Sequence, residues 1–142
     1  MCSIDDFLSK KLQTLTHFNT NLPMKKTLVF GASLRPYRYS NLAMKRLVEH
    51  NVDTVAFGLR EGTVAGVQVS NKLAGFQNVH TITLYMNPDR QKAFYGDLIH
   101  LSPKRVIFNP GTENPELYAL LRKHGIEVEV ACTLVLLATG KY

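Results

Sequence analysis

One stretch decides the fold: Thr27-Leu-Val-Phe-Gly-Ala-Ser-Leu-Arg-Pro-Tyr-Arg-Tyr-Ser40. Its first four residues, 27–30, are β-branched or apolar and predict a short buried strand. The loop that follows begins with small residues and carries two arginines. In the next segment, 41–50, the apolar residues share one face of a helix. The stretch therefore predicts a β-α unit joined by a loop of small and basic residues.

The same alternation of strand-like and helix-like segments continues along the chain. Further β runs occupy 54–57, 81–85, 105–108 and 126–131, and a short strand is expected at 67–69. Two helix starts share one signature, Asn-Pro followed by an acid, at Asn87-Pro88-Asp89 and Asn114-Pro115-Glu116. The sequence predicts an α/β fold, a doubly wound, mostly parallel five-stranded sheet with helices on both faces and right-handed crossovers.

Length and composition are those of one globular domain. The chain has 142 residues, 45% of them hydrophobic and 20% charged, which excludes disordered and fibrous classes. We expect residues 1–24 to form an N-terminal extension, either a short helix or disordered, and residues 25–142 to form the domain. Within the extension, apolar residues recur at helical spacing, namely Phe7, Leu8, Leu12, Leu15 and Phe18.

Charge, cysteines and hydropathy narrow the class of partner. The formal net charge is +6, which favours an anionic ligand. The basic pairs Lys104-Arg105 and Arg122-Lys123 lack interleaved aromatics, so nucleic acid is not indicated. No apolar run approaches the ~20 residues of a membrane helix. Two cysteines far apart in the sequence, Cys2 and Cys132, predict reduced thiols and a cytoplasmic protein.

Topology nominates the loops that would bind a ligand. In doubly wound sheets, ligands lie beyond the carboxyl ends of the strands, where the strand order reverses. The loops concerned are Gly31–Ser40, Gly58–Gly62, Met86–Asp89 and Asn109–Asn114.

The loop after the first strand has the features of a phosphate cradle. Gly31, Ala32 and Ser33 let the backbone approach an anion, and amides near Ser40 at the helix start would point toward it. Arg35 and Arg38 add positive charge. The loop is neither a G-x-G-x-x-G fingerprint nor a Walker loop. A tight turn with solvated arginines is the alternative interpretation.

Three other features fall at the same edge. Arg60, just past the second strand, suits a ribose that bears a phosphate, although a solvated arginine is the alternative. The turn Asn109-Pro-Gly-Thr112 ends a strand directly ahead of a helix start. Asn87 and Pro88 form a similar turn after the fourth β run. Both turns could exist for backbone reasons alone. Their shared position at the predicted ligand edge of the sheet strengthens the functional interpretation.

These motifs resemble a known family. From about Lys26 to Tyr142 the chain looks like the small single-domain coenzyme A-binding proteins, whose Rossmann-like fold is similar to the CoA-binding domain of the succinyl-CoA synthetase alpha subunit. The matching pieces are Leu28-Val-Phe-Gly-Ala-Ser33, Arg38-Tyr39-Ser40, Gly66-Val67-Gln68-Val69, Asn109-Pro-Gly-Thr112 and Cys132-Thr133. The sequence departs from the commoner pattern at Phe57-Gly58-Leu59-Arg60.

The resemblance implies a ligand and a set of contact residues. It implies that the first loop touches the nucleotide pyrophosphate, that Arg35 or Arg38 meets phosphate, and that the turns at Asn87 and Asn109 line the pocket. The full set of candidate cofactor-binding residues is Gly31, Ala32, Ser33, Arg35, Arg38, Tyr39, Ser40, Gly58, Arg60, Asn87, Pro88, Asn109, Pro110, Gly111 and Thr112.

The functional hypothesis is a protein that binds coenzyme A or an acyl-CoA, with no catalysis inferred. Cys132 could exchange acyl groups, but no histidine is placed as its base, and a buried structural cysteine is the simpler interpretation. The histidines show no metal-ligand spacing. The alternative is an NADP-dependent oxidoreductase or another dinucleotide-binding protein. A protein partner or a homo-oligomer stays open, and neither nucleic acid nor membrane is expected as a partner.

Overall fold

The computed structural model describes residues 25–142, and the expected extension, residues 1–24, lies outside the described residues. Seven strands are present: β1 (Thr27–Phe30), β2 (Thr54–Phe57), β3 (Gly62–Val64), β4 (Val67–Ser70), β5 (Thr81–Leu84), β6 (Arg105–Phe108) and β7 (Glu127–Val130). The helices are α2 (Tyr39–Glu49), α3 (Pro88–Gln91), α4 (Tyr95–His100), α5 (Pro115–Lys123) and α6 (Thr133–Ala138), with a 3₁₀ turn, η1 (Lys92–Phe94), between α3 and α4.

All seven strands form one sheet in the order β3-β4-β2-β1-β5-β6-β7. Neighbouring strands are parallel throughout, except that β3 pairs antiparallel with β4. The strands end level with one another, because Phe30 is in register with both Phe57 and Leu84, and Leu84 with Phe108. The loops that follow these strands therefore start from a common edge.

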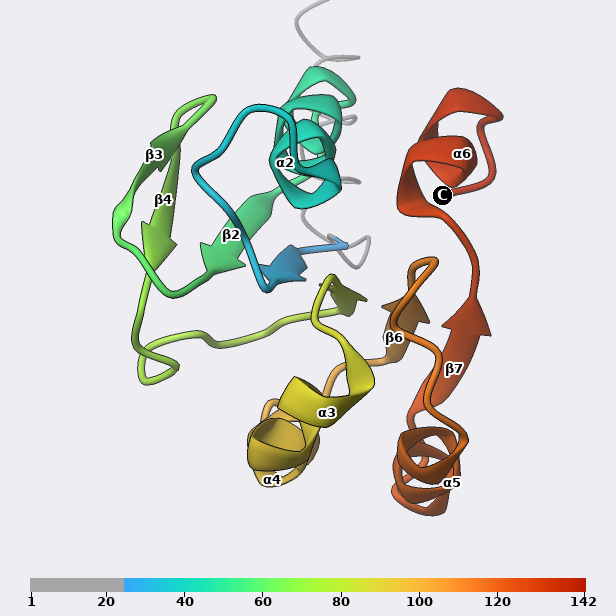
Figure 1. The fold of residues 1–142 in the computed structure, drawn as a ribbon. Helices are drawn as coiled ribbons and strands as arrows, with labels where there is room; N and C mark the ends of the chain where they lie inside the picture. The colour runs from blue at the N-terminus through green and yellow to red at the C-terminus, as the bar shows by residue number, and fades with distance from the viewer. Residues whose placement is uncertain (1–24) are drawn as a thin grey trace, which may run out of the picture.

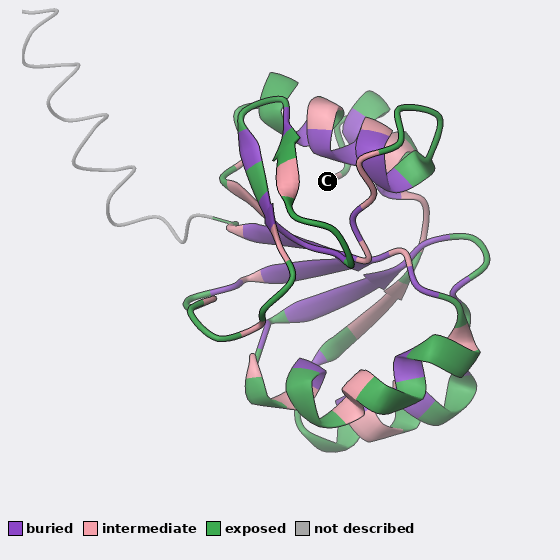
Figure 2. Ribbon diagram, turned by 60° about the vertical axis from the view of Figure 1, so that its left-hand side comes forward, coloured by how far each residue is buried: buried purple, intermediate pink, exposed green. Residues whose placement is uncertain are grey.

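Helices cover both faces of the sheet, as expected for a doubly wound fold (Figure 1). α2 and α6 lie on one face, and α3, α4 and α5 lie on the other. Residues alternate between the faces along each strand, so each face has its own core. Val29 of β1 packs with Met44 and Leu47 of α2, whereas Phe30 packs with Leu98 of α4 and Leu117 of α5. The central strands are accordingly buried along their length (Figure 2).

The prediction of five strands is wrong, and the structure has seven. The additional pairing comes from a β-hairpin after β2, in which Thr63 is opposite Gln68 and Ala65 and Gly66 both have positive φ. β3 has only three residues, one exposed and one half-buried, so its sequence shows no alternation of apolar and polar residues that would predict a strand. The topology rule assigns Gly62 to the loop after the second strand, and in the structure Gly62 instead begins β3.

Helix positions agree with the sequence signatures, and one helix was not expected. Asn87 and Asn114 are the N-caps of α3 and α5, and each accepts a hydrogen bond from a backbone amide of the first turn. The helical segment that starts after Asn87 is divided into α3, η1 and α4. α6 forms from the apolar run after β7. No helix in residues 25–142 has the length and apolarity needed to cross a bilayer.

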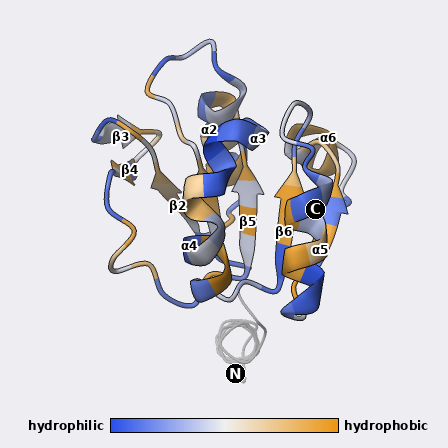
Figure 3. Cartoon of the chain, turned by 60° about the horizontal axis from the view of Figure 1, so that its bottom comes forward, coloured by the Kyte–Doolittle hydropathy of each residue, from blue (hydrophilic) through white to orange (hydrophobic). Residues whose placement is uncertain are grey.

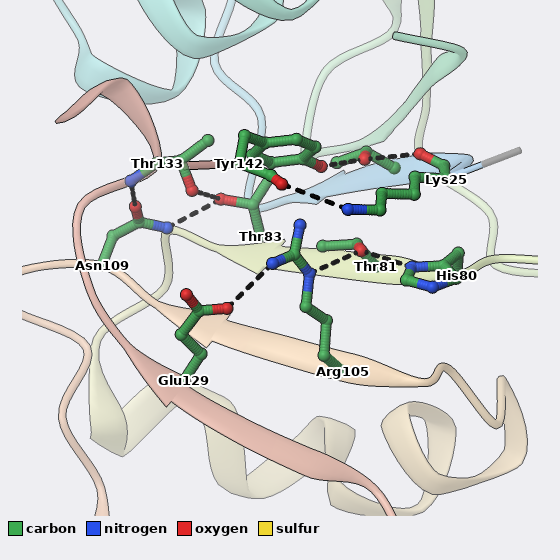
Figure 4. A network of polar contacts seen from close by, with 10 residues as sticks. Lys25, His80, Thr81, Thr83, Arg105, Asn109, Glu129, Thr133 and Tyr142 are labelled. Atoms are coloured by element: carbon green, nitrogen blue, oxygen red, sulfur yellow. Dashed lines mark hydrogen bonds and ion pairs between the residues drawn. The ribbon is translucent and has the colours of Figure 1, made fainter. Parts of the chain in front are cut away.

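One part of the sheet face under α6 is polar rather than apolar. β5 is pale beside the hydrophobic β6 in Figure 3, because two of its four residues are threonines. Buried Arg105 donates to Thr81 Oγ1 at 2.9 Å and to Glu129 Oε2 at 2.9 Å, and the Tyr142 ring lies 4.6 Å above its guanidinium (Figure 4). The Tyr142 hydroxyl is also hydrogen-bonded to Thr27 Oγ1 of the central strand. These polar contacts hold the end of the described chain against β1, β5 and β6.

Candidate functional site

The strand order reverses at β1, which places the switch point between the β1–α2 loop and the loop after β5. From β1 the chain moves outward to β2 and β4, then crosses back to β5 on the other side. The two loops touch at Gly31, where a Cβ atom would lie only 3.1 Å from the Tyr85 carbonyl carbon. Gly31 also has φ +96°, a conformation that side-chain-bearing residues rarely adopt. Gly31 therefore closes the base of the switch-point crevice.

Gly58 joins the loop after β2 to the same place. A Cβ at Gly58 would lie 2.1 Å from the Ala32 carbonyl oxygen, which is a direct clash with backbone. The Gly58 amide donates to Ser70 of β4 at 2.9 Å. The glycine is thus required by the packing of one loop on another. It lies beneath the candidate site, so its predicted ligand contact stays a prediction.

The amides of the phosphate cradle already have partners within the chain. Gly31 and Ala32 both donate to the Phe57 carbonyl, at 2.9 and 2.8 Å. Ser33 donates to Ser40 Oγ at 3.1 Å and accepts from Asn41 Nδ2 at 2.9 Å. These bonds fix the loop backbone in place. Free donors for an anion must therefore come from elsewhere in the loop.

The start of α2 supplies such donors. Its N-cap is Arg38, whose side chain forms no capping hydrogen bond, and the first turn holds no acidic residue. Within the described chain, the Tyr39 and Ser40 amides have no hydrogen-bond partner. An uncapped helix start carries a partial positive charge and open N–H groups, which together favour an anion. The expected placement of helix-start amides at Ser40 is consistent with this geometry.

Arginines surround the helix start. Arg35 and Arg38 are exposed, and both contact exposed Tyr37. Arg35 donates a 3.3 Å hydrogen bond to the Tyr37 hydroxyl, and the Arg38 guanidinium carbon lies 5.7 Å from the centre of the Tyr37 ring. Arg60 is exposed in the loop before β3. The three guanidinium groups form no salt bridge within the described residues. Their charge is therefore available to a ligand.

Asn87 and Pro88 occupy the loop after β5. Asn87 is exposed, and its Oδ1 accepts from the Arg90 amide at 3.0 Å. Pro88 takes the first helical position of α3. Both residues are at the carboxyl edge of the sheet, and both have a clear role in starting the helix.

Asn109 lies at the same edge but is 1% exposed. Its Nδ2 donates to Thr83 Oγ1 at 2.8 Å and to the Leu84 carbonyl at 2.9 Å, while its Oδ1 accepts from the Thr133 amide at 2.8 Å (Figure 4). The side chain thus connects β5, β6 and the start of α6. All its hydrogen-bonding groups are occupied, so its evident role is structural.

The rest of that turn is divided between surface and interior. Pro110 and Gly111 are exposed, and Gly111 has φ +93°. Thr112 is buried and donates to the Asn109 carbonyl at 2.7 Å. Only the tip of the turn is therefore able to contact a ligand in this conformation.

Gln91 is a site-supporting residue that sequence reasoning missed. It is fully buried, and its Nε2 donates to the Met86 carbonyl at 2.7 Å and to the Thr112 carbonyl at 2.8 Å. Its Oε1 accepts from Asn114 Nδ2 at 2.8 Å. One side chain thus joins the loop after β5 to the loop after β6. A glutamine in a polar helical segment gives no sequence signal for such a role.

Two buried polar groups, on elements that flank the crevice, have no hydrogen-bond partner within the described chain. The Asn41 Oδ1 atom on α2 and the Tyr85 hydroxyl after β5 are both buried and unpaired within residues 25–142. Burial raises the pKa of the Tyr85 phenol to about 12, so at neutral pH it is a neutral donor. Cys132 is a free, half-buried thiol at the N-cap of α6. No cluster of potential metal ligands occurs among the described residues.

Fold and site together define a class of protein: a doubly wound α/β domain with an uncapped, arginine-flanked helix start at its topological switch point. Comparison with known families narrows the class. Residues 25–138 match the CoA binding domain family, and the chain belongs to that family.

Solved structures agree on the fold. A structure described as an uncharacterized protein is 44% identical, with a TM-score of 0.81, covering 84% of this chain and 98% of the other. A hypothetical protein from Pyrococcus horikoshii OT3 is 24% identical, with a TM-score of 0.70 and coverage of 81% and 82%. A protein from Thermus thermophilus is 19% identical, with a TM-score of 0.73 and coverage of 92% and 98%. No curated protein matches the chain.

Proposed function

We propose that this protein binds coenzyme A or an acyl-CoA at the carboxyl edge of its sheet. The observation that carries the proposal is the start of α2: two amides without partners, no acidic residue in the first turn, and exposed Arg35 and Arg38 beside them. Membership of the CoA binding domain family supports the same ligand.

The residues present fit the chemistry of that ligand. Coenzyme A carries a pyrophosphate and a 3′-phosphate, and its pantetheine arm carries amides and a hydroxyl. The helix start and the arginines would hold the phosphates. Arg60 is exposed on the loop after β2, which starts from the same edge of the sheet, and is proposed to meet the 3′-phosphate.

When bound, coenzyme A supplies a thiol that carries acyl groups as thioesters. The chain's own contribution in this proposal is to hold and orient that ligand. Gly31 permits close approach of the two switch-point loops, Gln91 joins the loop after β5 to the loop after β6, and the arginines neutralise phosphate charge. No catalytic step is proposed.

The test is calorimetric titration of the protein with CoA, dephospho-CoA, NADPH and NADH in parallel. We expect CoA to bind and dephospho-CoA to bind about 10-fold to 100-fold more weakly, as expected for the loss of a charge-assisted contact. Tight NADPH binding without CoA binding would contradict the proposal and favour the dinucleotide alternative, for which Arg60 is also suited.

Substitutions then identify which arginine contacts which phosphate of coenzyme A. Arg38→Ala should weaken binding of CoA and of dephospho-CoA by similar factors, because both ligands keep the pyrophosphate. Arg60→Ala should weaken CoA far more than dephospho-CoA. The matched control is Arg46→Ala, at the far end of the same helix, where the guanidinium pairs with Glu49 at 3.0 Å. Unchanged CoA affinity in both Arg38 and Arg60 variants would remove the arginines from the site.

A further inference from the structure

A chain of side-chain hydrogen bonds links the outer surface of the molecule to the two loops that Gln91 joins. Asn114 Nδ2 donates to Gln91 Oε1 and to the Tyr95 hydroxyl, both at 2.8 Å. The Tyr95 hydroxyl in turn donates to Glu116 Oε1 at 3.1 Å. The four residues come from α3, α4 and the start of α5, which lie on one face of the sheet (Figure 1). Three helices therefore share one polar network.

The two amide side chains of the network can each take only one orientation. Gln91 Nε2 donates to two backbone carbonyls, those of Met86 and Thr112, so Gln91 Oε1 is left as the acceptor. Asn114 Nδ2 uses both of its protons, one on Gln91 and one on Tyr95. Gln91 is fully buried and Asn114 is 7% exposed. A bond lost between them would therefore leave a buried polar group unsatisfied.

Tyr95 and Glu116 complete the network at its outer end. The Tyr95 hydroxyl accepts a proton from Asn114 and has one proton of its own, which it donates to Glu116. The Tyr95 ring packs against the core, so the hydroxyl can be removed while the ring keeps its place. Glu116 is exposed in the first turn of α5. The outer end can therefore be changed without altering either loop or the Asn114 cap.

The inner end of the network holds both loops next to their exposed parts. Gln91 binds the carbonyls of Met86 and Thr112. Met86 directly precedes Asn87, and Thr112 directly follows Gly111. Asn87 and Gly111 are both exposed candidate ligand residues. The separation of the two exposed turns therefore depends on the orientation of one amide, which the rest of the network fixes.

We propose that Tyr95 and Glu116 are positioning residues for the ligand site. Their hydrogen bond holds Asn114, and through it Gln91, in the orientation that sets the distance between the loops after β5 and β6. Both residues act through Gln91 and not by touching the ligand. The inference rests on the proposed function, because it takes the two loops to contact coenzyme A.

The first test compares two substitutions of Glu116. Glu116→Ala and Glu116→Gln both remove a negative charge from the first turn of α5, but only glutamine keeps an acceptor oxygen for the Tyr95 hydroxyl. In calorimetric titrations we expect Glu116→Ala to bind CoA about 3-fold to 10-fold more weakly than wild type, as for the loss of one hydrogen bond. Glu116→Gln should bind as wild type does. Equal CoA affinity in the two variants, whether reduced or not, would overturn the proposal.

The second test removes the hydroxyl between the two ends. Tyr95→Phe should also weaken CoA binding about 3-fold to 10-fold. Combining it with Glu116→Ala should weaken binding no further, because both changes break the same hydrogen bond. Tyr118→Phe is the matched control, since this tyrosine of α5 packs its ring edge-on against Phe108, outside the network, and it should bind CoA as wild type does. Additive losses in the double variant would contradict action through one network.

The side-chain amide of Gln91 provides a measurement that needs no ligand. Both Nε2 protons are hydrogen-bonded and buried, so they should exchange slowly with solvent in NMR spectra. Tyr95→Phe should speed this exchange about 10-fold, and Glu116→Gln should leave it unchanged. Faster exchange without weaker CoA binding would overturn the positioning role. Failure of wild type to bind CoA would overturn the proposed function instead, and the exchange alone would then decide whether Tyr95 holds the loops.

Discussion

Two asparagines at the carboxyl edge look alike in the sequence, since each is followed by proline, but their surroundings differ. Asn87 is exposed and caps α3 with one hydrogen bond. Asn109 is buried and makes three hydrogen bonds, two to β5 and one to the start of α6. Sequence reasoning could place both at the ligand edge but could not separate them, because burial depends on α6, which packs over Asn109 from the far end of the chain.

This difference predicts unequal losses of stability. Asn109→Ala should lower the free energy of unfolding by about 2–4 kcal/mol, because the buried Leu84 carbonyl and Thr133 amide lose their partner. Asn87→Ala should cost only about 1 kcal/mol, the usual loss for a helix cap. Urea unfolding monitored by circular dichroism measures both. Similar small losses would show that Asn109 is not the structural tie that its contacts indicate.

Tyr85 predicts a pH dependence. Burial raises its pKa in the folded protein to about 12, above the usual 10, so the folded state keeps the phenolic proton that the unfolded chain releases. The contribution of Tyr85 to the stability of the folded protein is therefore present below pH 10 and is lost as the pH rises from 10 toward 12. Tyr85→Phe should leave stability at pH 7 unchanged or slightly raised, since the hydroxyl has no partner in residues 25–142.

Between pH 10 and 12 the phenylalanine variant should lose stability less steeply than wild type. The loss of stability that remains in the variant would come from Tyr142, whose pKa is also raised by burial. Urea midpoints measured at half-unit steps of pH provide the comparison. If the urea midpoints of the variant and of wild type fall equally with pH, groups other than Tyr85 cause the loss of stability at alkaline pH.

Helix α2 shows a conflict between stability and binding at the level of an element. Its N-cap is an arginine in extended conformation with no capping bond, although aspartate or serine would stabilise that position. Arg38→Asp should therefore raise the free energy of unfolding by about 0.5–2 kcal/mol and at the same time abolish CoA binding, because the cap occupies the amides and adds negative charge. Arg38→Ala should weaken binding without the gain in stability. Thermal unfolding and calorimetry on the same samples test the pair.

Elements with strong local signals were predictable from the sequence. The Asn-Pro-acid signature gave the starts of α3 and α5, and the apolar runs gave β1, β2, β5 and β6. β3 and α6 were missed because neither forms its structure from local pattern alone. β3 depends on a hairpin with β4, and α6 on the amide that Asn109 caps.

For the whole molecule, alternation of strands and helices predicted the class of fold and both covered faces. It could not give the number of strands or the support provided by Gln91, which depends on a contact with Thr112, 21 residues further along the chain. The candidate ligand residues came from the topology rule together with the family resemblance. The structure places most of them at one edge and shows that several, Asn109 and Gly58 above all, are also required for packing.

The position of β1 in the sheet sets the order in which a growing chain can assemble. β1 is synthesised before the other six strands of the described sheet, yet on one side it pairs with β5, which begins at residue 81. Until β5 has left the ribosome, one edge of the central strand β1 has no partner strand and is able to pair with another nascent chain. The switch-point crevice likewise forms only once Tyr85 is in place, so a ligand could act on folding only after the loop beyond β5 has been synthesised.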